Sequence, residues 1–468
     1  MKIKYIFIFA ALITALSSCK KFLDVKPKTE IESTTAFEDE QGFKDALTGL
    51  YVKMGRDSLY GKELSYGLLE VLSKGYTELP TSDIYYQPSR YNYLDTASRK
   101  RLDGIWNQGY NMIANDNNLI SNLNSASPSL FGANNYNVIK GEAYGLRAFM
   151  HFDLLRLYSR SPASAGSTNV PGIPYSEVLD KKTSPTLSVS QVIAKVLADL
   201  EMAASLLKIS DPIVPGSGVS ATGYLRDRQY KFNYYAVKAL QARVYLYNND
   251  KVKALECARE VIQSGAFTFT PSSQIAAPAG QSINKLLTQE LVFSLNISTL
   301  QTRADASFAV NTGPFSSLTT QYKQIYEDVI TDVRFAYMTR PNDNDSKRYS
   351  TKFIAPTASA ARMPLIRWTE MYYIAAECLK DSDPAAAVNY LNLVRRQRNV
   401  LTNLSATLSS TQIQNEIFKE YRKEYLAEGQ LFFYYKRLNR PTIEFSTVSA
   451  NDNVYVLPKP DNQIEYGN

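Results

Sequence analysis

The protein has 468 residues, of which 44% are hydrophobic and 21% are charged, and its formal net charge is +7. The charge is spread along the chain, with no basic tract of the kind that binds nucleic acid, so we expect no nucleic-acid partner. The single histidine, His151, excludes zinc sites that need two or three histidines, and a Ser-His-Asp or Cys-His centre would have to use it.

The chain begins with a short positive stretch and an apolar run at 5–16 that leads to Cys19. About a dozen apolar residues suit a signal-peptide core, whereas a membrane-spanning helix needs about 20. The sequence LSSC before the tether looks like a lipobox, in which the cysteine is acylated; the alternative is an ordinary secretory signal with an incidental cysteine. We therefore expect a lipoprotein signal peptide at 1–18, lipidation of Cys19, and a lipidated tether at 19–32.

The first half of the body contains helical patterns with an irregular segment among them. Apolar residues recur at helical spacing at 42–57, 101–123, 136–158 and 189–207, and the segment at about 76–100 shows no such period. Trp106 shares a helical face with other apolar residues, so we expect it in the core. His151 lies in YGLRAFMHFDLLRLYS, where a packed or partly exposed helix residue is favoured over a catalytic base.

The second half contains three units that resemble tetratricopeptide helix hairpins. The clearest runs from 232 to 267, where small residues allow close helix approach and the turn is Asn-Asn-Asp. The others are at 368–399, where Pro384 suits the first turn of its second helix, and at 411–439. We expect Trp368 in the core of the second unit.

Between the first and second hairpins, 266–365 is irregular and contains three runs with strand-like composition, AFTFT, ELVFSLNIS and RYSTKFI. Cys257 and Cys378 both lie in helical patterns, which favours buried free thiols over a disulfide. The sequence thus predicts a mainly α protein with a single body at 33–468. Its scaffold would be made of tetratricopeptide-like helix pairs, and an irregular, loop-rich lobe would contain short β-strands.

The ordered set of motifs resembles the SusD/RagB family of outer-membrane nutrient-binding lipoproteins. The matching pieces are CKKFLDVKP, IWNQGYNMIANDNNLI, GEAYGLRAFMHFDLLRLYS with VPGIPY, the hairpin at 232–264, RWTEMYYIAAECL, EYRKEYLAEGQLFFYYKR and VYVLPKPDNQIEYGN. The resemblance implies a non-enzymatic protein on the outer face of the outer membrane, held there by its lipid anchor. It also implies a SusC-like TonB-dependent transporter as partner and a glycan, or in some members a peptide, as ligand.

Sugar rings present flat C–H faces that stack on aromatic rings, while their hydroxyls need polar partners. We therefore looked for aromatic residues among polar ones in the two irregular regions, from which the resemblance implies that the ligand site is built. The region at 76–100 offers Tyr85, Tyr86, Arg90, Tyr91, Asn92 and Tyr93, and the segment at 302–349 offers Phe308, Phe315, Tyr322 and Tyr326. The alternative for the first set is a loop whose tyrosines pack on the scaffold with their hydroxyls in water.

Three other functions compete with glycan capture: a peptide binder of the same fold, a structural helical-repeat lipoprotein, and a carboxylate-based glycosidase. The sequence predicts no cofactor and no metal site. NDNDS at 342–346 is similar to the start of a calcium-binding loop, but Lys347 stands at its third ligand position and Ile354 where the bidentate glutamate belongs, so a solvated turn is favoured.

Overall fold

The computed structural model describes residues 36–76, 79–132, 134–180, 184–276, 283–309, 312–342, 346–354 and 361–466. The predicted signal peptide, Cys19, the tether and residues 343–345 of the calcium-like sequence lie outside the described residues. Within these ranges, no helix combines the length and the apolar character needed to cross a membrane.

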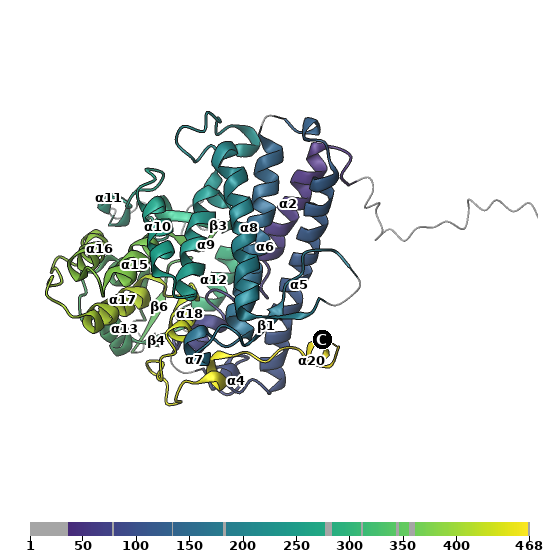
Figure 1. The fold of residues 1–468 in the computed structure, drawn as a ribbon. Helices are drawn as coiled ribbons and strands as arrows, with labels where there is room; N and C mark the ends of the chain where they lie inside the picture. Colours follow the sequence, from purple (N-terminus) through teal and green to yellow (C-terminus); the bar gives the residue numbers. More distant parts are fainter. Residues whose placement is uncertain are drawn as a thin grey trace, which may run out of the picture.

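Four long helices form one side of the molecule and lie next to one another (Figure 1): α2 (Glu40–Met54), α5 (Thr96–Ser125), α6 (Asn135–Tyr158) and α8 (Val189–Ser210). They correspond to the four helical segments predicted in the first half of the body. Side chains cap their starts, since Asp95 accepts a hydrogen bond at α5 and Ser188 forms a capping box at α8. Gly145 allows close packing on α6, because an added Cβ would lie 2.4 Å from the ring of Phe232.

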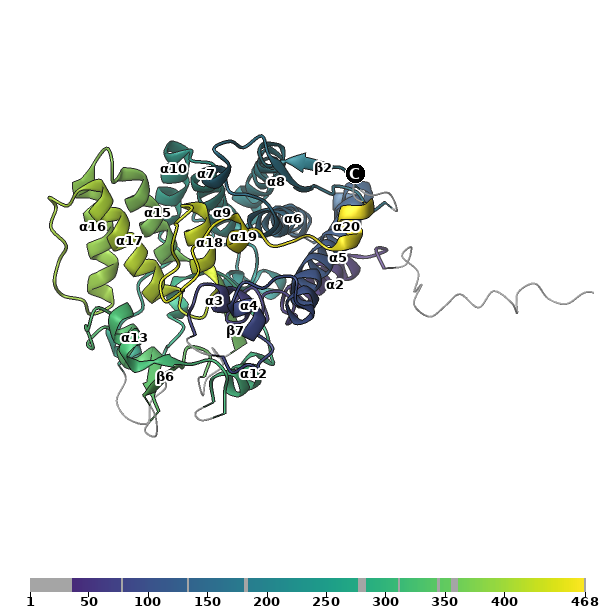
Figure 2. The ribbon, with the colours of Figure 1, turned by 90° about the horizontal axis from the view of Figure 1, so that it is seen from below.

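The three predicted hairpins are present as helix pairs. They are α9 (Tyr234–Tyr247) with α10 (Lys251–Ile262), α15 (Trp368–Leu379) with α16 (Pro384–Gln397), and α17 (Ser410–Glu424) with α18 (Gln430–Arg437). Helix α9 packs on α8, α10 packs on α15, and α15 packs on α17, so the pairs continue the stack begun by the long helices. Figure 2 shows this row of helices from below. The prediction of a tetratricopeptide-like scaffold is confirmed.

The segment between α10 and α15 contains most of the strands. Strand β3 (Leu291–Asn296) pairs antiparallel with β7 (Arg362–Arg367), and a small sheet has the order β4 (Ser317–Leu318), β6 (Lys347–Ser350), β5 (Thr339–Pro341). Two of the strand-like runs therefore contain strands, but AFTFT at 266–270 forms none, so that prediction was wrong. A third pair, β1 (Pro171–Pro174) and β2 (Thr186–Ser188), precedes α8.

Short helices occupy the connections. They are α3 (Leu68–Leu72), α4 (Tyr86–Ser89), α7 (Pro162–Ala165), α11 (Ser272–Ile275), α12 (Leu300–Phe308), α13 (Thr319–Ile325), α14 (Val333–Met338), α19 (Asp452–Tyr455) and α20 (Asp461–Tyr466), with 3₁₀ turns at Pro128–Leu130, Gly223–Leu225, Arg228–Tyr230 and Thr288–Glu290.

The C-terminal segment returns to the first helices of the chain. The N–H of Leu457 donates to the carbonyl of Leu157 at 3.0 Å, and Arg99, at the start of α5, donates to the carbonyl of Lys459 at 3.2 Å. Figures 1 and 2 both place α20 beside one end of α5. The C-terminal segment is thus held at the start of α5 and the end of α6.

The tryptophans and cysteines of the scaffold helices are packed in its core. Trp106 and Trp368 are buried, and the Trp368 indole donates to the carbonyl of Val261 at 3.2 Å. Cys257 and Cys378 are buried free cysteines. These outcomes agree with the expectations from the helical patterns.

His151 is fully buried and stacks on the ring of Tyr175 at 3.8 Å. The N–H of Ser176 donates to its Nε2 at 3.1 Å, so Nδ1 carries the ring proton and donates to the carbonyl of Arg147 at 2.9 Å. Burial lowers the pKa of His151 to about 3, which keeps the ring neutral. The prediction of a packed helix residue is confirmed.

Candidate ligand-binding surface

The two irregular regions proposed for ligand contact meet in the structure. Tyr76, at the start of the first region, stacks on Phe315 of the second with ring centroids 4.3 Å apart and planes 6° from parallel. Tyr85 approaches the same Phe315 ring at 5.4 Å. Figure 2 shows α3 and α4 close to α12 on the same side of the scaffold. The residues from 79 to 95, here called the tyrosine loop, therefore rest on the second region.

Two tyrosines of the tyrosine loop that were proposed for ligand contact are buried, and the structure favours the alternative that their rings pack on the scaffold. Tyr85 is 1% exposed and its hydroxyl donates to Glu63 at 3.0 Å, while Tyr93 is 6% exposed and donates to the carbonyl of Val454 at 2.6 Å. Each ring thus has a face covered by protein and a hydroxyl with a protein acceptor. Neither ring can stack on a ligand in this conformation.

The four aromatic residues proposed from the second region are also buried. Phe308 and Phe315 belong to the main core, and Tyr322 and Tyr326 form a smaller cluster with Leu426, at the end of α17. All four are at most 1% exposed. The composition of this segment resembles an open binding loop, but its aromatic residues attach the segment to the scaffold, so they present no surface to a ligand here.

Tyr91 is half-buried and fixes the shape of the tyrosine loop. Its backbone is in the left-handed region, with φ of 59°, and its hydroxyl donates to the carbonyl of Leu72 at 3.0 Å. The ammonium of Lys74 lies over its ring at 4.9 Å and also donates to the carbonyl of Ser89. These contacts join the loop to the end of α3.

Tyr86, Arg90 and Asn92 are three of the proposed residues that the structure leaves at least partly accessible, and we call them the exposed trio. Arg90 and Asn92 are exposed, Tyr86 is half-buried, and the Arg90 guanidinium lies over the Tyr86 ring at 5.6 Å. Asn92 donates to the side chain of Gln87 at 3.0 Å, which directs its amide along the surface. The trio combines an aromatic ring with donors and an amide acceptor.

Sequence reasoning missed two cations at this surface, Lys62 and Lys74. Lys62 lies over the rings of Tyr85 and Phe315, at 5.4 and 5.8 Å, and Lys74 lies over Tyr91. Both come from the segment around α3, ahead of the tyrosine loop, and no local pattern marks a lysine that reaches a ring more than ten residues away. The surface is therefore more cationic than the loop sequence alone indicates.

Three residues in and around the tyrosine loop have strained backbone conformations. Lys74, Tyr91 and Phe445 all have φ near +60°, a region that costs a residue with a side chain on the order of 1–3 kcal/mol. Phe445 and Lys74 line the same small cavity. Strained residues persist only where surrounding contacts fix them, and they are common at binding sites.

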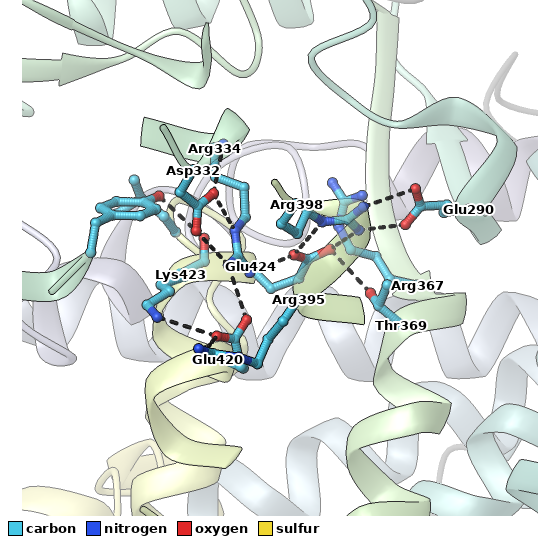
Figure 3. Close-up of polar contacts among 12 residues, drawn as sticks. Glu290, Asp332, Arg334, Arg367, Thr369, Arg395, Arg398, Glu420, Lys423 and Glu424 are labelled. Atoms are coloured by element: carbon cyan, nitrogen blue, oxygen red, sulfur yellow. Dashed lines mark hydrogen bonds and ion pairs between the residues drawn. The ribbon is translucent and has the colours of Figure 1, made fainter. Parts of the chain in front are cut away.

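A buried network of ion pairs fastens the irregular lobe to the scaffold (Figure 3). Glu424 at the end of α17 accepts hydrogen bonds from Arg398 at 2.7 Å and from Arg334 at 3.0 Å. Arg398 also donates to Glu290 at 3.1 Å, and Arg334 pairs with Asp332 at 2.7 Å. All five side chains are buried, so charges from four separate segments neutralise one another away from water.

The network continues at both ends through Glu420 and Glu428. Glu420 pairs with Arg334 at 2.9 Å and with Arg395 at 3.1 Å, and Glu428 accepts two hydrogen bonds from Arg367, at 2.6 and 2.7 Å. Burial raises the pKa of Glu420, but the nearby cations more than offset it and lower the value to about 2. The motif EYRKEYLAEG thus has a structural role, because its glutamates bind buried arginines from other segments of the chain.

The structure also contains wider hollows away from the tyrosine loop. One, of about 510 Å³, is lined by α7 and by the ends of helices α9, α15 and α18, and another, of about 470 Å³, lies near Arg228, Phe267 and Arg362. Neither includes a residue proposed from the sequence. Among the described residues, no group of three or more His, Cys, Asp or Glu side chains is arranged to hold a metal ion.

Comparisons with known proteins give consistent matches. A family model described as "Starch-binding associating with outer membrane" matches residues 21–246, and the SusD family model matches residues 292–466. The chain is similar to SusD-like proteins P2 and P38 of Formosa agariphila, at 25% identity over 273 residues and 24% over 265. These alignments cover 56% of this chain and 47% and 46% of the relatives, so the chain spans about half the length of the curated relatives it matches.

Solved structures match over nearly the whole chain. A SusD superfamily protein from Bacteroides thetaiotaomicron aligns with a TM-score of 0.70 and 21% identity, covering 91% of this chain and 98% of its own. A SusD-like carbohydrate binding protein from Bacteroides vulgatus aligns with a TM-score of 0.72 and 18% identity, covering 92% and 96%. At these identities the likeness establishes the fold.

Proposed function

Because the chain belongs to the SusD/RagB family, we propose that it is a cell-surface lipoprotein of the outer membrane that captures a glycan and delivers it to a SusC-like TonB-dependent transporter. The description of the matching family model names starch binding and the outer membrane, and one structural neighbour is a carbohydrate binding protein. Acylated Cys19 would hold the protein at the membrane.

The exposed trio is the observation that carries the proposed capture of a glycan. Tyr86 offers a ring on which the C–H face of a sugar can stack, and Arg90 and Asn92 place hydrogen-bonding groups beside it for the hydroxyls. The buried tyrosines contribute indirectly. Since Tyr85 and Tyr93 fix the loop to the scaffold, little conformational entropy remains to be lost when a ligand binds.

A glycan array followed by calorimetric titration of the bound glycans tests this proposal. We expect Tyr86→Ala to weaken binding by roughly tenfold, because a stacked ring contributes on the order of 1–2 kcal/mol. Tyr245→Ala is a matched control, since Tyr245 is also half-buried under a cation, Lys253 at 5.3 Å, but lies on α9. Equal binding by wild type and Tyr86→Ala would place the site elsewhere, with the hollow near α7 as the next region to mutate.

The proposal also excludes turnover of the ligand. A glycan incubated with the purified protein should be recovered with unchanged mass, whereas shorter products would favour the glycosidase alternative. A peptide library run beside the glycan array separates the two binding functions. Binding of peptides alone, sensitive to Tyr86→Ala, would replace the glycan with a peptide as the ligand.

A further inference from the structure

Three cations of the candidate surface lack an acidic partner. Lys62, Lys74 and Arg90 lie over aromatic rings of the tyrosine loop, and none of them forms an ion pair within 4 Å to any residue in the described ranges. Arg90 is exposed, and Lys62 and Lys74 are half-buried. In the buried network around Glu424, by contrast, each arginine has at least one carboxylate partner.

The carboxylates near these cations are held by other donors. Glu63 is buried and accepts from the hydroxyl of Tyr85 at 3.0 Å and from the N–H of Leu68 at 3.2 Å. Asp83 accepts from the N–H of Tyr85 at 2.7 Å, and Asp95 caps α5. The local carboxylates therefore support the backbone and the buried tyrosine, and Glu63 pairs with Arg101 at 3.5 Å, so none of them forms an ion pair with the three cations.

Two of the cations also repel each other. Burial, and then the charge of Arg90, lower the pKa of Lys74 to about 8. Lys74 cannot move away, because its ammonium donates to the carbonyl of Ser89 and its own backbone is fixed in the left-handed region. A negative group bound beside Arg90 would remove this repulsion.

We propose that the captured glycan is acidic, with carboxylate or sulfate groups that pair with Arg90 and Lys62 while a neighbouring sugar ring stacks on Tyr86. This inference rests on the proposed function and names its ligand class. Hydrogen bonds between charged groups are about twice as strong as neutral ones, and a guanidinium matches the two oxygens of a carboxylate or sulfate. Rings beneath Lys62 and Arg90 hold these side chains in place without neutralising them.

Backbone-matched glycans test the charge requirement directly. The protein would be titrated with dextran sulfate oligosaccharides against dextran of the same length, and with oligogalacturonate against its methyl ester. We expect an acidic member to bind at least roughly tenfold more tightly than its neutral counterpart, and its affinity to fall with added salt. Arg90→Gln and Lys62→Gln should each remove most of this difference. Lys253→Gln, at the control tyrosine on α9, should leave it unchanged.

The outcomes separate this inference from the proposed function. A preference confined to the sulfated pair or to the uronate pair would identify which anionic group is bound. Equal affinity within both pairs, or an array whose bound glycans are all neutral, would overturn the acidic ligand and leave glycan capture standing. An array with no bound glycan would count against glycan capture itself and against this inference with it.

Discussion

Replacing Glu424 with glutamine should destabilise the protein severely while barely changing its shape. Glu424 lies at the centre of the buried network, 2.7 Å from Arg398 and 3.0 Å from Arg334, and all three residues are at most 2% exposed. Glutamine keeps the oxygen that accepts from Thr369 at 3.1 Å but removes the negative charge. Arg334 and Arg398 would keep their other carboxylate partners but lose the one negative charge that they share.

The expected loss is about 3–5 kcal/mol, the cost of removing one partner from a buried ion pair. The upper part of this range applies here, because water cannot reach Arg398 or Arg334 to replace the lost charge. Glu290 and Asp332 still pair with these arginines, so the loss of stability should not exceed this range. Such a change is a large fraction of the stability of a typical protein.

Urea unfolding of wild type and Glu424→Gln measures this loss as a lower midpoint at unchanged slope. Glu201→Gln, on an exposed carboxylate of α8, is the control and should stay within about 0.5 kcal/mol of wild type. A Glu424→Gln midpoint equal to that of the control would refute the argument that the network fastens the lobe.

The same network sets the direction of acid sensitivity. The pKa of Glu420 is lowered from 4.5 to about 2, so its stabilising contribution is complete above pH 4.5 and is lost as the pH falls toward 2. Wild type should therefore lose stability over that range.

Four further changes test other parts of the structure. Tyr85→Phe removes the donor to buried Glu63 and should cost about 1–3 kcal/mol of stability, measured by a thermal melt. Asp116→Asn should raise the melting temperature at pH 7 and do so much less near pH 4. Burial raises the pKa of Asp116 well above 3.8, and its oxygens have no hydrogen-bond partner in the described chain. Asp116 therefore destabilises the folded protein increasingly as the pH rises above 3.8, because the same carboxyl ionises readily in the unfolded chain. Trp106→Ala should cost about 3–5 kcal/mol, measured by urea unfolding, because it empties a buried site. Cys19→Ala should move the protein from the membrane fraction to the soluble fraction, and a membrane-bound variant would contradict the lipobox.

The scaffold could be predicted because its signals are local. Helical spacing of apolar residues, small residues at close helix contacts and capping side chains are all readable within one segment, and the three hairpins appear where these signals place them. Trp106 and Trp368 were assigned to the core for the same reason.

The candidate surface was predicted only in part, because residues far away in the sequence decide whether each aromatic ring is buried or exposed. Tyr85 and Tyr86 are neighbours in sequence, yet one is covered by Phe315, more than 200 positions away, and the other remains accessible. The charged motif at 420–428 has the composition of a solvated helix face. Its burial follows from arginines supplied by other segments, such as Arg334 and Arg398, and no local pattern indicates such partners.

The return of the C-terminal segment to the first helices constrains the order in which the molecule can be completed. Tyr93 is fixed by Val454, 361 positions later, and Arg99 by Lys459, 360 positions later. Contacts of such separation form late in folding, because a long stretch of chain must be ordered before its ends meet. The helix pairs can assemble from neighbouring segments, whereas the tyrosine loop reaches its final shape only when the last residues have arrived. Proteolytic loss of the C-terminal segment would accordingly disorder the tyrosine loop first and leave the helix pairs of the scaffold folded.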